Sequence, residues 1–196
     1  MVLRSHWGYP LSLAIFVEGR SDKLSIPILL RKLTRIRILT HIISAGDMLD
    51  VEEMSRHIRF LGARNVQMVI IFRDSECTDP EYWIAKAKIL EPEFAKRGHK
   101  MPVRYVIVSH SLEGWLACDE AALRAVLGPR VRLTALPNVA CACRPAEAMK
   151  QLFKRNGKSF NKVIHNPRIA ENVEPRALAR NSPTFAYLVS LVSNQP

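Results

Sequence analysis

The sequence predicts an α/β domain built on a mainly parallel sheet flanked by helices. Short apolar runs rich in strand-forming residues alternate with stretches whose apolar residues recur at helical spacing. Strands separated by helices pair in parallel through right-handed crossovers. At 196 residues the chain can bury a sizeable core, and its 48% hydrophobic and 24% charged content is ordinary for a globular protein.

The expected strands are short and end on polar residues. They cover residues 12–18, 35–44, 66–72 and 103–108. The third, VQMVIIF, is almost continuously apolar, which is typical of a strand buried on both faces of a parallel sheet. Open α/β sheets bind ligands at the carboxyl ends of their strands, so the side chains that follow these runs are the first candidates for a site.

Helices are expected between the strands and in the last third of the chain. They cover residues 21–33, 48–61, 82–97, 113–127 and 145–153, with a final helix starting at Ser182-Pro183. Pro27 either kinks the first helix or moves its start to Ser25. Residues 1–10 are expected to be a loose leader and residues 128–143 a loop. We expect an α/β domain over residues 1–127 and a basic loop and helical extension over residues 128–196, packed together as one compact unit.

The chain is strongly basic, with 29 Lys and Arg against 18 Asp and Glu and a net charge of +11. This excess favours polyanionic partners, nucleic acid first and an acidic partner or membrane surface second. Candidate phosphate contacts gather in the C-terminal third: Lys150, Lys154, Arg155, Lys158 and Lys162. Phe160 is available there for base stacking. The alternative is a solvated helix face that binds nothing in particular.

Cysteine spacing and hydropathy indicate an intracellular environment. Cys77, Cys118, Cys141 and Cys143 show no paired CxxC spacing, so we expect reduced, partly buried thiols and not a zinc site. No apolar run approaches the length of about 18 residues that a membrane span requires. The N-terminus has no cleavage site typical of a secretory signal. We therefore expect a cytoplasmic protein with no membrane partner.

Acidic side chains follow two of the predicted strands. Asp74 and Glu76 come after the third strand, and Glu18 comes after the first. Carboxylates that share a cleft repel one another unless a cation lies between them, and hard oxygen ligands favour Mg²⁺ or Mn²⁺. Glu18 would share that metal or act as general acid or base on a phosphodiester. The alternative is that each is an ordinary surface acid at the start of a loop.

Two of these segments resemble the Toprim domain. The motifs are VEGRSD at residues 17–22 and IFRDSE at residues 71–76. The resemblance, which extends to the overcoming-lysogenization-defect nucleases, implies a Rossmann-like fold and Mg²⁺-dependent phosphodiester chemistry. It makes Glu18 the general acid/base glutamate and a metal ligand, and it makes Asp74 and Glu76 the metal-binding pair, here Asp-x-Glu instead of Asp-x-Asp. Asp22 matches the acid that helps some Toprim nucleases to hold a second metal.

A closer resemblance covers most of the chain. SHSLEGWLACD at residues 109–119, the basic segment after Arg144, and NSPTFAYLVSLV at residues 181–192 are similar to a Toprim-like family of unknown function. Its members often lie beside AAA- or ABC-type ATPases in defence-like settings, which implies such an ATPase as a partner.

Three polar residues of the SHSLEGWLACD motif have two interpretations each. His110 follows the fourth strand and would assist a leaving group or bind phosphate, or it is hydrogen-bonded in a loop. Glu113 is a further candidate for the site, or it complements a helix dipole. We expect Asp119 to be structural and Trp115 to lie in the core.

These observations together predict metal-dependent phosphodiester chemistry on nucleic acid, most concretely a Toprim-type nuclease. The alternative is a non-catalytic module that binds nucleic acid or an ATPase. The choice between DNA and RNA, the number of metals, the need for an ATPase partner and the oligomeric state are left open by the sequence.

Overall fold

The computed structural model contains a four-stranded, fully parallel sheet with strand order β2-β1-β3-β4. It describes residues 11–62, 65–131, 133 and 142–193, so most of the expected loop at 128–143 and the leader at 1–10 lie outside the described residues. The strands are β1 (Ser12–Val17), β2 (Arg37–Ile42), β3 (Val66–Asp74) and β4 (Val103–Val108). The predicted α/β class, the parallel sheet and the flanking helices are confirmed, and the arrangement is consistent with a Rossmann-like fold.

Helices occupy most of the remaining described chain. They are α1 (Arg20–Arg31), α2 (Val51–Arg59), α3 (Pro80–Lys96), α4 (Leu112–Ala117), α5 (Glu120–Leu127), α7 (Pro145–Arg155), α8 (Lys162–Asn172), α9 (Pro175–Asn181) and α10 (Pro183–Ser193), with a short 3-10 turn η1 (Asp47–Leu49). None of the helices in the described part of the chain is long and apolar enough to cross a membrane.

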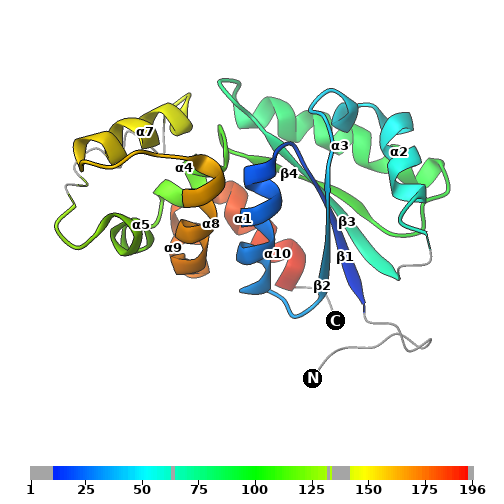
Figure 1. The fold of residues 1–196 in the computed structure, drawn as a ribbon. Coiled ribbons are helices and arrows are strands. Elements are labelled where there is room, and N and C mark those ends of the chain that lie inside the picture. Colours follow the sequence, from blue (N-terminus) through cyan, green and yellow to red (C-terminus); the bar gives the residue numbers. More distant parts are fainter. Residues whose placement is uncertain (1–10, 63–64, 132, 134–141, 194–196) are drawn as a thin grey trace.

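The sheet separates two hydrophobic layers, and the alternation of side chains along each strand decides which layer each residue joins. Leu13 and Ile15 of β1 face the larger layer, while Ala14 and Phe16 face the smaller one. Figure 1 shows α1 and α10 on one side of the sheet and α2 and α3 on the other. Both faces of the central strands are therefore covered, as the apolar VQMVIIF run predicts.

The C-terminal segment contributes to the larger layer. Phe153 of α7, Ile169 of α8 and Leu188 of α10 are fully buried there together with Leu29 of α1. The core thus includes residues from both sides of residue 127, and the division of the chain at that point stays a prediction.

The helices differ from the sequence expectation in three places. The helix expected over residues 113–127 is two helices, because the chain turns at Cys118 and Asp119, and the Asp119 carboxylate caps α5. Helices α8 and α9 follow α7 where the sequence analysis predicted none. Pro27 lies inside α1, which begins at Arg20, so a start at Ser25 is wrong. The Ser25 hydroxyl donates to the Ser21 carbonyl at 2.8 Å within this helix.

The expectation of reduced thiols is wrong for two cysteines. Cys77 and Cys143 form a disulfide with a Cα–Cα distance of 4.7 Å, although 66 positions separate them in the sequence. The bond connects the loop after β3 to the segment that precedes α7. The Cys118 thiol donates to the Gly114 carbonyl at 3.4 Å, and Cys141 lies outside the described residues. Spacing alone did not reveal the pair because the fold brings the two segments together.

Candidate functional site

Glu18 lies at the carboxyl end of β1, directly beside the end of β3. Its Oε1 atom accepts a hydrogen bond from Arg73 Nη1 at 2.6 Å and from the backbone N–H of Asp74 at 3.3 Å. The side chains of Glu18 and Arg73 are only 20% and 11% exposed, so this ion pair is largely shielded from water. Because β1 and β3 are parallel neighbours, the sheet itself places Glu18 against Asp74.

Asp22 lies in the first turn of α1 and folds back over the turn that follows Glu18. A Cβ atom added at Gly19 would lie 3.2 Å from Asp22 Oδ2, so the absence of a side chain at Gly19 lets this carboxylate approach closely. Burial, followed by the charges of Glu113 and Glu18, raises the pKa of Asp22 to about 6, while Lys162 opposes the shift. Asp22 therefore holds its proton well above the usual range of a carboxyl group.

Asp74 is the last residue of β3. Burial is the largest cause that raises its pKa well above the usual value, and the charges of Asp22, Glu18 and Glu113 act in the same direction. Arg73 partly offsets them. Like charges at close range disfavour ionisation of each carboxyl group, so this end of the sheet gathers carboxyl groups whose mutual repulsion Arg73 and Lys162 offset only in part.

Glu113 reaches the same place from α4. It is 4% exposed; its Oε2 accepts from the Ser111 hydroxyl at 2.7 Å and its Oε1 from Asn166 Nδ2 at 2.8 Å. Asn166, on α8, also donates to the Ser21 hydroxyl at 2.9 Å. We refer to Glu18, Asp22, Asp74 and Glu113 as the carboxylate cluster; they come from three segments that are far apart in the sequence.

A family model described as a domain of unknown function (DUF4276) matches residues 17–192. The chain belongs to this family. The match begins one residue before Glu18 and includes every member of the carboxylate cluster. No curated protein and no solved structure matches the chain. The description of the DUF4276 family names no activity, so a relationship to the Toprim domain stays a prediction.

Two predicted site residues of this DUF4276 chain lie in the loops after β3 and β4 and bind each other. Glu76 has a φ of 51° and His110 a φ of 59°. The Glu76 N–H donates to the His110 carbonyl at 2.8 Å, and His110 Nδ1 lies 2.6 Å from the Glu76 carbonyl oxygen. The Glu76 side chain is exposed, so its backbone and not its carboxylate makes these contacts. The structure therefore brings Glu113, and not Glu76, into contact with the network around Asp22 and Asp74.

The predicted phosphate contacts all lie on exposed positions of α7, α8 and the intervening turn: Lys150, Lys154, Arg155, Lys158 and Lys162. Lys162 connects this surface to the carboxylate cluster, because its charge acts on Asp22 and its carbonyl accepts from the Ser21 hydroxyl at 3.2 Å. Phe160 is not free for base stacking: its ring packs against Phe153, with centroids 4.9 Å apart, and against His165.

The donor atoms of the carboxylate cluster have the hard oxygen chemistry that Mg²⁺ and Mn²⁺ prefer. The buried Oδ1 of Asn166 has no hydrogen-bond partner among the described residues, so one further oxygen donor lies close to Glu113. In the described part of the chain, no group of three or more His, Cys, Asp or Glu side chains is arranged to hold a metal ion as it stands. The donor atoms therefore suit such a cation chemically. Their positions in this structure do not form a complete coordination shell.

Sequence reasoning missed three residues of this site: Arg73, Asn166 and Ser21. Arg73 carried a detectable signal, because it is a charged residue that directly continues an otherwise apolar strand. Asn166 carried none, since it lies in a helix that was not predicted and reaches Glu113 across 53 positions of sequence. Ser21 carried none either, because its hydroxyl contacts two residues of the same unpredicted helix, Asn166 and Lys162.

Proposed function

We propose that this protein carries out metal-dependent phosphodiester chemistry on nucleic acid, most concretely as a Toprim-type nuclease, with the carboxylate cluster as the reaction centre. The observation that carries the proposal is that Glu18, Asp22 and Asp74 gather where β1 and β3 end, and their proximity raises the pKa of Asp22 and Asp74. Both carboxyl groups are kept close to other carboxylates at the carboxyl edge of a parallel sheet, where such folds place their ligands. Perturbed carboxyl groups of this kind gather at functional sites.

Asp22, Asp74 and Glu18 are the side chains that we assign to Mg²⁺ or Mn²⁺. Such an ion, when bound, neutralises phosphate charge and lowers the pKa of bound water. Glu18 is also our candidate general acid or base, and Arg73 orients it through the 2.6 Å contact. The Asp74 N–H holds the same carboxylate oxygen, so Glu18 is fixed from two directions. His110, whose Nδ1 is turned towards the Glu76 carbonyl, is the candidate for assisting the leaving group.

Nucleic acid is the substrate class that the charge distribution favours. The chain carries a net charge of +11, and the exposed Lys and Arg side chains of α7 and α8 extend from Lys162, next to the cluster. Cationic side chains along such a path neutralise successive phosphates, while the cluster itself repels a phosphodiester until a cation is present. An AAA- or ABC-type ATPase belongs to the proposal as a partner only through the family resemblance.

One observation favours a second candidate, a non-catalytic module that binds nucleic acid or an ATPase. Glu18 is paired with Arg73, and no three acidic, His or Cys side chains of the described residues are set to hold a metal. A protein that retains the basic surface but has no catalytic activity would also have Glu18 paired with Arg73 and no preformed metal site.

A cleavage assay separates the two candidates. Single- and double-stranded DNA and RNA are incubated with the protein and Mg²⁺ or Mn²⁺, and Glu18→Gln and Asp74→Asn are compared with the native chain. A nuclease yields metal-dependent products that each variant reduces by about 10²-fold or more. Salt-sensitive binding without products in either metal contradicts the enzyme and supports the module.

Two further carboxylates sharpen this assay. Glu52→Gln is the matched control, because Glu52 is exposed on α2, on the other side of the sheet, and its removal should leave cleavage unchanged. Glu76→Gln distinguishes the Toprim motif from the observed cluster: a large loss assigns the metal-binding pair to Asp74 and Glu76. An unchanged rate together with a large loss in Glu113→Gln assigns the reaction to the carboxylate cluster.

Nucleic-acid binding is tested through its dependence on salt. Replacing Lys154 and Lys158 by Ala should lower affinity for all sequences alike and reduce the salt slope by about one for each lost phosphate contact. Lys96→Ala is the control, since Lys96 is 69% exposed at the end of α3 and lies on the opposite side of the sheet. Equal effects of all three substitutions would contradict a phosphate path over α7 and α8.

A further inference from the structure

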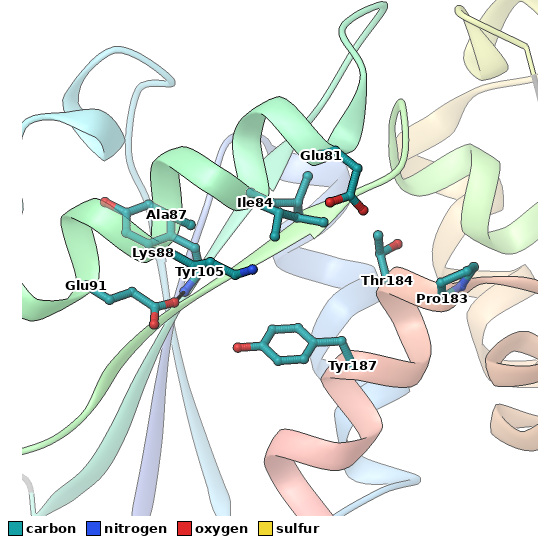
Figure 2. A pocket seen from close by; sticks show the side chains of 10 residues that line it. Glu81, Ile84, Ala87, Lys88, Glu91, Tyr105, Pro183, Thr184 and Tyr187 are labelled. Carbon is teal, nitrogen blue, oxygen red and sulfur yellow. Dashed lines mark hydrogen bonds between the residues drawn. The ribbon is translucent and has the colours of Figure 1, made fainter.

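A second site lies away from the carboxylate cluster, along the free edge of the sheet. A cavity of about 310 Å³ opens there between α3, the edge strand β4 and α10. Figure 2 shows Tyr187 of α10 facing Ile84 and Lys88 of α3 across an open space. Its volume is within the range of about 300–1,000 Å³ that is typical of small-molecule sites. The cavity is therefore large enough for a compact ligand.

The edge of β4 turns backbone hydrogen-bonding groups towards this cavity. Val69 N–H donates to the Pro102 carbonyl and Ser75 N–H to the Val108 carbonyl, so even-numbered residues of β4 face β3. In a parallel strand the intervening residues point the other way, so the N–H and C=O of Tyr105 and Ile107 face outward. Among the described residues no hydrogen-bond partner is found for the N–H and C=O of Ile107 or for the C=O of Tyr105, although Ile107 is only 4% exposed and Tyr105 only 3%. Buried backbone groups of this kind require a partner.

Two other backbone groups of this edge are already paired with side chains. The Glu91 carboxylate accepts the Tyr105 N–H at 2.8 Å, and Arg104 Nη1 donates to the Val103 carbonyl at 3.1 Å. Side chains that cover an edge in this way prevent another strand from adding to it. The Tyr105 carbonyl and the N–H and C=O of Ile107 are left beside the cavity, and this short stretch suits a compact molecule and not an extended peptide.

The walls and rim restrict the chemistry of that molecule further. Ile84, Ala87 and Tyr187 present apolar and aromatic surface, which suits a flat ring between α3 and α10. Glu81 and Glu91 place two carboxylates at the cavity, against the Lys88 amine and the Arg104 guanidinium, which pairs with Glu91 at 3.5 Å. Acidic and basic groups therefore balance here, unlike the positive excess of the whole chain, and the cavity offers a phosphate group no net attraction.

We propose that this cavity binds a purine base or nucleoside without phosphate, with the ring between Ile84 and Tyr187 and an adjacent donor and acceptor on its edge paired with the C=O and N–H of Ile107. Adenine carries such a pair in its exocyclic amine and the neighbouring ring nitrogen. The site is independent of the carboxylate cluster, so nucleoside binding is tested separately from the proposed nuclease activity.

The test is a titration of the full chain by calorimetry with adenosine, purine riboside and AMP, with metal-free buffer throughout. Adenosine should bind saturably. Purine riboside, which lacks the exocyclic amine, should bind about fivefold more weakly because one hydrogen bond is lost. AMP should bind no more tightly than adenosine, because the cavity offers its phosphate no net positive charge. Absence of saturable adenosine binding at millimolar concentration overturns the proposal, as does equal affinity for adenosine and purine riboside.

Two variants locate the site on the protein. Tyr187→Ala removes one face of the ring slot and should weaken adenosine binding by at least about fivefold, the effect of losing one stacked aromatic side chain. Ala87→Leu fills the cavity from α3 and should abolish binding. Ile89→Ala, on the same helix and 71% exposed, is the control and should bind as the native chain does. Thermal melts identify any variant that fails to fold, and native affinity in folded Tyr187→Ala contradicts the assignment.

Discussion

Two acids of this protein, Asp119 and Asp22, have opposite surroundings. Asp119 is 3% exposed, and its two carboxylate oxygens accept the backbone N–H groups of Ala122 and Glu174 at 3.0 and 2.8 Å. Asp22 faces Glu113 and Glu18, and burial together with these charges holds its pKa at about 6. Asp119, whose oxygens accept backbone hydrogen bonds, joins two helices. Asp22, which lies among other carboxylates, favours binding of a proton or a cation. Substitutions at and around the two sites test this contrast.

The largest effect is expected from Asp119→Ala. The substitution removes the cap of α5 and leaves the Glu174 N–H without its acceptor, so we expect a loss of about 3 kcal/mol in the free energy of unfolding. Urea denaturation with an unchanged m-value measures it. Asp119→Asn retains one acceptor oxygen and should fall between the native chain and the Ala variant. A loss below about 0.5 kcal/mol in the Ala variant would show that Asp119 does not join the helices.

At neutral pH, Asp22→Asn should have the opposite effect on the free energy of unfolding and stabilise the protein. Because the pKa of Asp22 is raised from 3.8 to about 6 on folding, the folded state binds the proton more tightly, and the stability of the native chain falls as the pH rises from about 4 to about 6. The Asn variant does not ionise and should be more stable by about 2 kcal/mol at pH 8, after allowance for partial exposure.

The advantage of the Asn variant should disappear below pH 4, where the aspartic acid is protonated in both states. Urea denaturation between pH 4 and pH 8 measures the difference. A constant difference across that range would show that Asp22 does not titrate as its surroundings indicate. Asp50→Asn is a suitable comparison, because Asp50 is exposed and the backbone N–H groups of Glu52 and Glu53 lower its pKa, so its removal should cost stability at pH 8.

A bound divalent cation should offset the mutual repulsion of the carboxylate cluster and so stabilise the folded protein. At ten times its dissociation constant, Mg²⁺ or Mn²⁺ should add about 1.4 kcal/mol to the stability of the native chain at pH 8. The gain should shrink at pH 5, because protonated Asp22 and Asp74 no longer offer charged ligands. Thermal melts with and without the ion measure it. Asp74→Asn should lose the gain, and a gain of equal size in that variant would place the cation elsewhere.

The smallest effect is expected from Gly19→Ala. The backbone at Gly19 has a φ of −140°, which alanine adopts readily, so the stability should change by less than about 1 kcal/mol. The new methyl group would meet Asp22 Oδ2 at 3.2 Å and displace that carboxylate from its neighbours. The pKa of Asp22, followed by NMR, should therefore move towards its ordinary value. An unchanged pKa would show that Gly19 is not what permits the close approach of Asp22.

Much of the architecture was predictable because strands leave local patterns. The four apolar runs and their helical separators predicted the parallel sheet, and Glu18 and Asp74 were identified as residues at strand ends. The order of the strands was not predictable, since pairing is a choice among distant segments. Helix α8 escaped prediction as well, because its Pro167 and its polar residues interrupt the apolar spacing.

By itself, the sequence determined the fold class, the strong positive charge and the presence of acids directly after buried strands, because each is a property of local composition and periodicity. Only the tertiary structure decided which acids meet. It brought Glu113 and Asn166 to Asp22 and Asp74, turned Glu76 towards solvent, and paired Cys77 with Cys143. Those outcomes depend on how helices pack across the sheet, and packing joins residues that have no relation along the chain.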